Sequence, residues 1–144
     1  MTSLITIFLM SNRITIETTV HADLKKVWDY WTIPEHVMRW NAASEDWECP
    51  AVKNDLVEGG KFVYTMRAKD GSASFDFSGT YTRIQEGRLI EYVIDDGREV
   101  SVLFEEIESG VHITEIFEAE TEHPEEMQRT GWQSILDRFK VYTE

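Results

Sequence analysis

The sequence predicts a single α+β domain, in which a curved antiparallel sheet of about six or seven strands accompanies two short helices and one long C-terminal helix. Apolar residues recur at helical spacing only over residues 24–40 and after residue 123, and between residues 48 and 120 they alternate with polar ones. Tight-turn signals separate the alternating segments, which is typical of an antiparallel meander and not of βαβ units. A chain of 144 residues suffices for one domain with a sizeable core.

The first residues are expected to lie outside this domain. Residues 4–10 are apolar, but they are far shorter than the roughly 20 residues that span a bilayer. No Lys or Arg precedes them and no small-residue cleavage site follows, so an export signal is not favoured. We interpret residues 1–11 as an N-terminal extension, with Met10 resembling a second start and a short extra strand as the alternative. Residues 12–144 are then the domain.

The first predicted elements are one strand and two short helices. Residues 13–20 alternate β-branched with polar side chains, as a strand with one buried face does. Asp23 stands at the N-cap position of an amphipathic helix that continues to about Trp31. Pro34 is well placed to open a second helix that ends near Trp40.

The alternating region is divided by glycine-containing turns. Gly59-Gly60 interrupts the alternation, and Asp70-Gly71 is a strong hairpin signal. Strands are expected at residues 61–67, 74–83, 89–94, 100–107 and 111–119, with a further alternating segment from residue 48.

The last element is a long amphipathic helix from Pro124 to about Tyr142. Met127, Gly131, Ile135 and Phe139 fall four residues apart and are expected to cover the sheet. Glycine in a helix is about 1 kcal/mol less favourable than alanine, so we expect Gly131 to permit a close approach.

Composition excludes several classes of partner. Lys and Arg number 14 against 27 Asp and Glu, and the net charge of −13 argues against binding nucleic acid or an anionic membrane. The single Cys49 cannot form an internal disulfide, which fits a reducing, cytoplasmic environment. The four histidines are scattered, so neither a metal nor a cofactor is expected.

No catalytic residue is assigned. Residues 36–48 contain His36 near Asp46 and Glu48, but nothing in the spacing requires acid–base geometry, and a surface position is preferred. Cys49 has no basic neighbour in the sequence to activate its thiol. Serines lack a nucleophile-elbow setting, and the chain has no glycine-rich phosphate loop.

Aromatic residues are the main candidates for binding. Alternation places Phe62, Tyr64 and Met66 on one strand face and Phe75, Phe77, Gly79 and Tyr81 on another, which suits the wall of a cavity or an ordinary aromatic core. Gly79 would let a helix approach closely. The tryptophans of the first helix are the most core-like, whereas those near the polar loop at residues 41–47 suit a pocket mouth. The candidate ligand-binding residues are Trp28, Trp40, Trp47, Phe62, Tyr64, Met66, Phe75, Phe77, Tyr81, Glu115, Trp132 and Ile135.

Glu115 is the most specific polar candidate for ligand binding. It shares strand parity with Val111, Ile113 and Phe117, so its carboxyl group points toward the covered face unless a bulge shifts the register. An unpaired buried carboxylate is costly and is often functional. We expect it inside the sheet–helix space, with a tyrosine hydroxyl or ordered water as its partner.

Several local strings carry a family resemblance. They are Val27-Trp28, Trp31-Thr32, Pro34-Glu35-His36, Arg39-Trp40-Asn41, Asp46-Trp47, Gly59-Gly60-Lys61-Phe62, Asp76-Phe77-Ser78-Gly79-Thr80-Tyr81 and Gly131-Trp132-Gln133-Ser134-Ile135-Leu136. Together with the element order, they resemble the START-like SRPBCC superfamily. Within this superfamily, the sequence resembles the branch that is related to the C-terminal domain of the activator of heat shock protein 90 ATPase. The resemblance covers about residues 12–143.

The resemblance implies a helix-grip fold with a hydrophobic cavity, but not one reaction. The first hypothesis is non-enzymatic binding of a small hydrophobic molecule that is aromatic, lipid or polyketide-like, with Glu115, Tyr64 or Tyr81 fixing its orientation. The second is a protein-interaction module that contacts a heat-shock chaperone, although the chain lacks room for the extra N-terminal domain of the eukaryotic activators. The third is a polyketide cyclase-like enzyme. A hollow interior favours binding or catalysis, and a filled one favours the interaction module. The sequence leaves the oligomeric state open.

Overall fold

The computed structural model describes residues 12–144, which form one seven-stranded sheet and three helices. The predicted extension over residues 1–11 lies outside the described residues. In chain order the elements are β1 (Arg13–Val20), α2 (Leu24–Thr32), α3 (Pro34–Trp40), β2 (Trp47–Asn54), β3 (Lys61–Ala68), β4 (Ser74–Gln85), β5 (Leu89–Ile94), β6 (Glu99–Ile107), β7 (Gly110–Glu118) and α4 (Glu125–Thr143).

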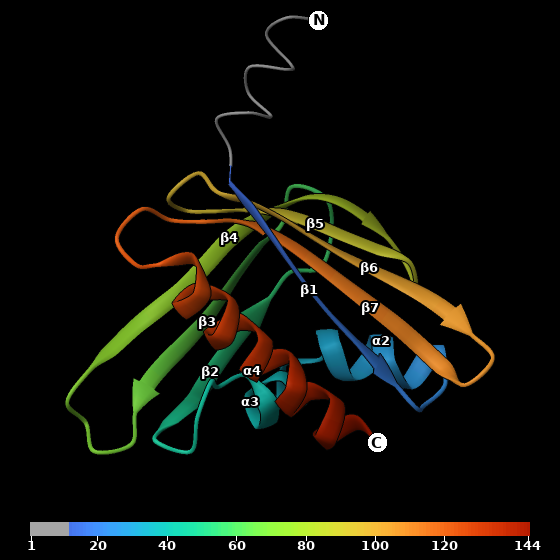
Figure 1. The fold of residues 1–144 in the computed structure, drawn as a ribbon, viewed down its shortest axis with the longest axis horizontal. Helices are drawn as coiled ribbons and strands as arrows, with labels where there is room; N and C mark the ends of the chain where they lie inside the picture. The colour runs from blue at the N-terminus through green and yellow to red at the C-terminus, as the bar shows by residue number, and fades with distance from the viewer. Residues whose placement is uncertain (1–11) are drawn as a thin grey trace, which may run out of the picture.

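The sheet confirms the predicted antiparallel α+β architecture. Its strand order is β1-β7-β6-β5-β4-β3-β2, so the meander runs from β2 to β7 and β1 pairs with the last strand. Irregularities interrupt the register in β2 between Glu48 and Ala51, and in β4 between Tyr81 and Arg83. Such bulges bend strands and increase their twist. The sheet curves around α4, as Figure 1 shows.

The two short helices begin where the sequence predicts. The side chain of Asp23 accepts a hydrogen bond from the backbone N–H of Lys26 at 2.8 Å, so it is the N-cap of α2. Pro34 occupies the first turn of α3. These helices connect the two edge strands, β1 and β2, and α4 crosses the concave face of the sheet (Figure 1). None of the helices within residues 12–144 is long and apolar enough to cross a membrane.

Burial along β7 has a strict period of two. Val111, Ile113, Glu115 and Phe117 are buried, and the residues between them are only partly buried. The predicted parity is therefore correct, and the inner face of β7 packs into the core with the side chains of α4. Glu115 is placed by the same alternation that buries its apolar neighbours.

The buried stripe of α4 differs from the prediction. Met127 is 60% exposed, and the buried residues of the helix are Gln128, Leu136, Phe139 and Thr143. A strict four-residue spacing drifts around a helix that has 3.6 residues per turn, so the first apolar residue leaves the covered face. A Cβ atom at Gly131 would have no heavy atom within 4 Å, so this glycine does not mediate the close approach that we expected.

Gly79 does permit a close contact, but not with a helix. It lies opposite Phe62 in the register of β3 and β4. A Cβ atom at Gly79 would lie 2.9 Å from Cε1 of Phe62 and 2.5 Å from the carbonyl oxygen of Val93. The glycine therefore makes room for an aromatic ring on the inner face of the sheet.

Candidate functional site

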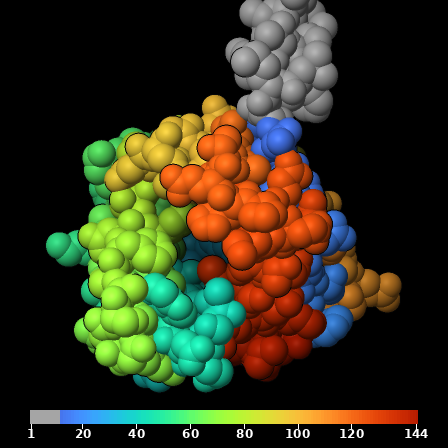
Figure 2. Space-filling view, turned by 60° about the vertical axis from the view of Figure 1, so that its left-hand side comes forward, coloured from blue at the N-terminus to red at the C-terminus, as the bar shows by residue number. Residues whose placement is uncertain are grey.

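A cavity of about 300 Å³ lies between the sheet and α4. This volume is at the lower end of the range of roughly 300–1,000 Å³ that is typical of small-molecule sites. Figure 2 shows the hollow between the lime-green atoms of β4 and the orange and red atoms of β7 and α4. Its lining residues are Trp31, Thr32, Trp40, Asn41, Phe62, Tyr64, Met66, Phe75, Phe77, Tyr81, Ile90, Tyr92, Arg98, Glu115, Trp132, Ile135 and Leu136.

Aromatic rings of β3, β4 and β5 form the sheet wall of the cavity. Phe62 lies at the centre of this group, and its ring centroid is 5.1 Å from that of Tyr64, 5.3 Å from that of Tyr81 and 4.9 Å from that of Tyr92. Phe77 adds a further ring at 5.7 Å from Phe62. The tilted and edge-on geometries are those that aromatic pairs favour, so the wall is a connected set of rings.

The tyrosine hydroxyls add neutral polar groups to this wall. The hydroxyl of Tyr81 donates a hydrogen bond to Oδ1 of Asn54 at 2.5 Å. Burial raises the pKa of Tyr81 to about 12, and it raises the pKa of Tyr64 and of Tyr92 well above the ordinary value. All three phenols therefore stay protonated at neutral pH.

Tryptophans close the cavity on the helical side. The ring of Trp132 stacks on that of Phe117, with 3.9 Å between centroids and 8° between planes. The ring centroids of Trp31 and Trp40 are 5.1 Å apart, and the ring centroid of Phe139 is 4.9 Å from each of them. Stacked, tilted and edge-on ring contacts therefore hold these side chains against one another on this side of the cavity.

Glu115 is the one acidic side chain in the lining. It is 6% exposed, and no hydrogen bond or ion pair joins its carboxyl group to any other residue within 12–144. The expected bond from a tyrosine hydroxyl is therefore not formed among these residues. Burial raises the pKa of Glu115 to about 8, so the carboxyl group is largely protonated at neutral pH.

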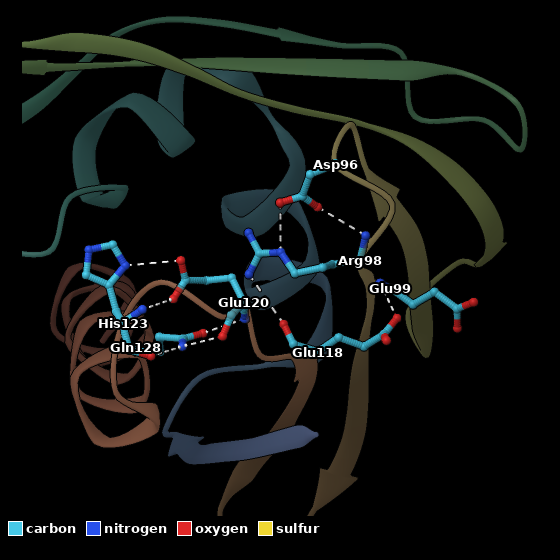
Figure 3. Close-up of polar contacts among 7 residues, drawn as sticks. All are labelled: Asp96, Arg98, Glu99, Glu118, Glu120, His123 and Gln128. Carbon is cyan, nitrogen blue, oxygen red and sulfur yellow. Dashed lines mark hydrogen bonds and ion pairs between the residues drawn. The ribbon is translucent and has the colours of Figure 1, made fainter. Parts of the chain in front are cut away.

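Arg98 lies at the rim, where the β5–β6 hairpin meets the end of β7 (Figure 3). Gly97, with φ of 95°, forms the turn that places it there. Its Nε donates to Oδ2 of Asp96 at 2.9 Å, and its guanidinium also donates to the carbonyl oxygen of Glu118 at 3.3 Å. The guanidinium is thus paired, and it lies close enough to Tyr92 for its charge to oppose part of the rise in the pKa of that phenol.

The loop between β7 and α4 is held by a second polar cluster, also drawn in Figure 3. Nε2 of Gln128 donates to the carbonyl oxygens of Glu120 and His123 at 3.0 and 2.8 Å. Glu120, Glu122 and His123 bring three potential metal-ligand atoms within 4.8 Å of one another. The carboxylate of Glu120 accepts from the backbone N–H of His123 at 2.7 Å and contacts its ring Nδ1 at 3.1 Å, so these groups stabilise the loop.

The structure places all but two of the sequence-predicted site residues in the lining; the exceptions are Trp28 and Trp47. Trp28 is 6% exposed and packs edge-on against Phe104, so it belongs to the core. Trp47 begins β2 and contacts Phe75 at 5.8 Å, outside the lining. The ligand-binding role of the others remains a prediction.

Sequence reasoning missed seven lining residues: Trp31, Thr32, Asn41, Ile90, Tyr92, Arg98 and Leu136. Tyr92 has the parity of Ile90 and Ile94 in β5, and this alternation could have indicated it. Arg98 belongs to a hairpin turn, and no periodic signal points to it.

Comparisons with known proteins agree with this fold. A family model described as activator of Hsp90 ATPase homolog 1-like protein matches residues 21–144. The solution structure of an AHSA1-like protein from Aeromonas hydrophila is 46% identical, with 91% of each chain covered and a TM-score of 0.87. A protein from Cytophaga hutchinsonii is 50% identical, with 92% of each chain covered and a TM-score of 0.81. A protein from Nitrosomonas europaea, 17% identical over 90% of this chain and 92% of that one, shares the fold with a TM-score of 0.79. No curated protein matches the sequence.

Proposed function

Since the chain belongs to the family of activator of Hsp90 ATPase homolog 1-like proteins, we propose that it binds a small hydrophobic molecule between the sheet and α4. The ligand is aromatic, lipid or polyketide-like. The observation that carries this proposal is the aromatic-lined cavity of about 300 Å³. Unfilled space in a core destabilises the fold, because the surrounding atoms lose packing contacts. A space of this size is therefore better explained by a ligand than by packing.

The lining divides into groups that supply area and groups that supply orientation. The rings of Phe62, Phe77 and Trp132 offer apolar surface, and their mutual contacts pre-organise it. Glu115 and Tyr64 offer polar groups that an incoming ligand can engage. A few polar groups in an otherwise apolar pocket are the usual arrangement in small-molecule sites.

The proposal is tested by filling the cavity from α4. Ile135→Phe adds volume at a lining residue, whereas Val141→Phe makes the same kind of change at a residue that is 77% exposed on the same helix. The probes are a flavonoid, a medium-chain fatty acid and an aromatic polyketide, titrated into the labelled full chain and followed by NMR. At least one should bind the wild type, and Ile135→Phe should weaken its binding about tenfold or more. Val141→Phe should leave it unchanged. Equal affinity in both variants would contradict the proposal.

A contact with a heat-shock chaperone is the second candidate, and family membership supports it. The test is titration of the full chain into purified Hsp90, with ATPase rate and heat of binding as readouts. A saturable heat together with a raised ATPase rate would favour this function over a purely ligand-binding one.

A further inference from the structure

The carboxyl group of Glu115 lines the cavity and has no polar partner within residues 12–144. Glu115 is 6% exposed and lines the cavity, and within residues 12–144 its carboxyl group forms no hydrogen bond or ion pair. Its cross-strand neighbours, Ile16 in β1 and Val102 in β6, are buried aliphatic residues that offer no donor. The carboxyl group lines the cavity, so its natural counterpart is a bound molecule.

The surroundings of Glu115 suit a positive charge. The lining rings of Phe62, Phe77, Tyr92 and Trp132 form one connected set, with centroid separations of 4.9 Å for Phe62–Tyr92, 6.4 Å for Phe77–Tyr92 and 6.0 Å for Phe77–Trp132. Tyr92 lies close enough for the charge of Glu115 to act on its phenol and raise its pKa further, after the larger effect of burial. Aromatic faces attract cations through the ring quadrupole, most strongly when water is excluded.

The protein supplies no cation of its own to this carboxyl group. Arg98 is the one basic residue in the lining, and it is paired with Asp96 and with the carbonyl oxygen of Glu118 at the rim (Figure 3). Burial raises the pKa of Glu115, and within residues 12–144 Arg98 forms its ion pair with Asp96 and none with the Glu115 carboxyl group. The other titratable groups in the lining are the phenols of Tyr64, Tyr81 and Tyr92, which are neutral, and α4 contributes only Trp132, Ile135 and Leu136. A chain with a net charge of −13 also attracts cations from a distance.

We propose that the cavity binds a small hydrophobic organic cation, an amine or quaternary ammonium compound, whose charged group pairs with the Glu115 carboxylate among the aromatic rings. This inference rests on the proposed function and specifies its ligand class. The cation takes the position that no side chain fills, and its apolar body contacts the rings of the sheet wall and Trp132.

Binding of such a cation is linked to pH with a defined sign. Free Glu115, with a pKa of about 8, must release its proton to form the ion pair. The affinity therefore rises as pH increases toward about 8, by up to about tenfold per pH unit, and then levels off. A ligand that accepts a hydrogen bond from the protonated carboxyl group would show the opposite dependence.

The test compares benzyltrimethylammonium with neopentylbenzene, its uncharged carbon isostere, by NMR titration of the labelled full chain at about pH 6 and about pH 9. The quaternary ammonium has no proton to lose, so any pH dependence comes from the protein. We expect the cation to bind at least about tenfold more tightly than the isostere at the higher pH, and at least about tenfold more tightly there than at the lower pH. Glu115→Gln should remove both differences and keep the binding of neopentylbenzene. Glu105→Gln, at an exposed glutamate of the neighbouring strand β6, should change neither.

Three results would overturn the inference. Equal or tighter binding of neopentylbenzene at both pH values would do so while leaving the proposed function intact. Binding of acetophenone that weakens as pH rises through about 8, with no preference for the cation, would assign Glu115 as a hydrogen-bond donor instead. Binding of neither benzyl probe would reject the cation, and the Ile135→Phe comparison would then decide separately whether the cavity binds other molecules.

Discussion

Glu115 lies on β7 between Ile113 and Phe117, and its carboxyl group is buried on a face where the neighbouring positions are apolar. A glutamine there would keep the shape and the polarity but could not ionise. The carboxyl group therefore has a thermodynamic consequence that can be measured without any ligand.

Glu115→Gln should stabilise the protein at alkaline pH and not at acid pH. The folded-state pKa of about 8 lies above the ordinary value of 4.5, so the folded protein keeps a proton that the unfolded chain has released. The contribution of Glu115 to stability is complete below about pH 4.5 and is lost as pH rises through about 8. At about 1.4 kcal/mol per pKa unit, the variant should exceed the wild type by up to about 5 kcal/mol at about pH 9, and the gap should close near pH 4.5. The measurement is urea denaturation across this range.

Glu105→Gln is the matched control, because Glu105 is exposed on the adjacent strand β6. Its stability profile should run parallel to that of the wild type. If the Glu115→Gln profile is also parallel, then the carboxyl group is not held in a water-poor environment.

Two glycines inside regular elements, Gly131 and Gly79, have opposite surroundings. Gly131 lies within α4 with open space where a Cβ atom would stand, whereas Gly79 lies within β4 against Phe62 and the carbonyl oxygen of Val93. Gly131→Ala should raise the free energy of unfolding by about 0.5–1 kcal/mol, because alanine favours the helix. Gly79→Ala should lower it by roughly 1–3 kcal/mol, because the ring and the strand must move apart. Thermal unfolding of both variants checks the opposite signs, and destabilisation by both would contradict the open space beside Gly131.

At the scale of α4 itself, the sequence predicted the bounds of the helix but not the exact face that it buries. The predicted helix from Pro124 to about Tyr142 is observed as Glu125–Thr143. Gln128 replaces Met127 on the covered face because its amide group satisfies the backbone of the preceding loop. A polar residue whose burial depends on contacts with backbone atoms leaves no hydrophobic signal in the sequence.

At the scale of the whole molecule, the strand order follows from local signals. Short glycine-containing turns join the neighbouring strands from β3 to β7, so the meander was readable from alternation and turn residues. Alternation also placed Phe62, Tyr64 and Glu115 correctly, because a strand assigns faces by parity alone.

The features that the sequence did not predict depend on three-dimensional packing. Trp28 and Trp31 both pack edge-on against Phe104, yet only Trp31 lines the cavity, and helical spacing alone does not distinguish them. Arg98 reaches the rim because a hairpin turn presents it beside the end of β7. Whether an aromatic interior is hollow or filled depends on how the rings of several strands interlock, which alternation cannot express.

The space between the sheet and α4 is expected to accept small hydrophobic molecules. The most direct measurement is titration of the ¹⁵N-labelled full chain with benzene, which occupies apolar cavities of suitable size. We predict saturable shifts at the indole N–H of Trp40 and Trp132 and at the backbone N–H of Glu115, with no response at the exposed Met127 and Val141. The absence of saturable shifts at the lining residues, or shifts confined to the exposed surface of α4, would contradict the account.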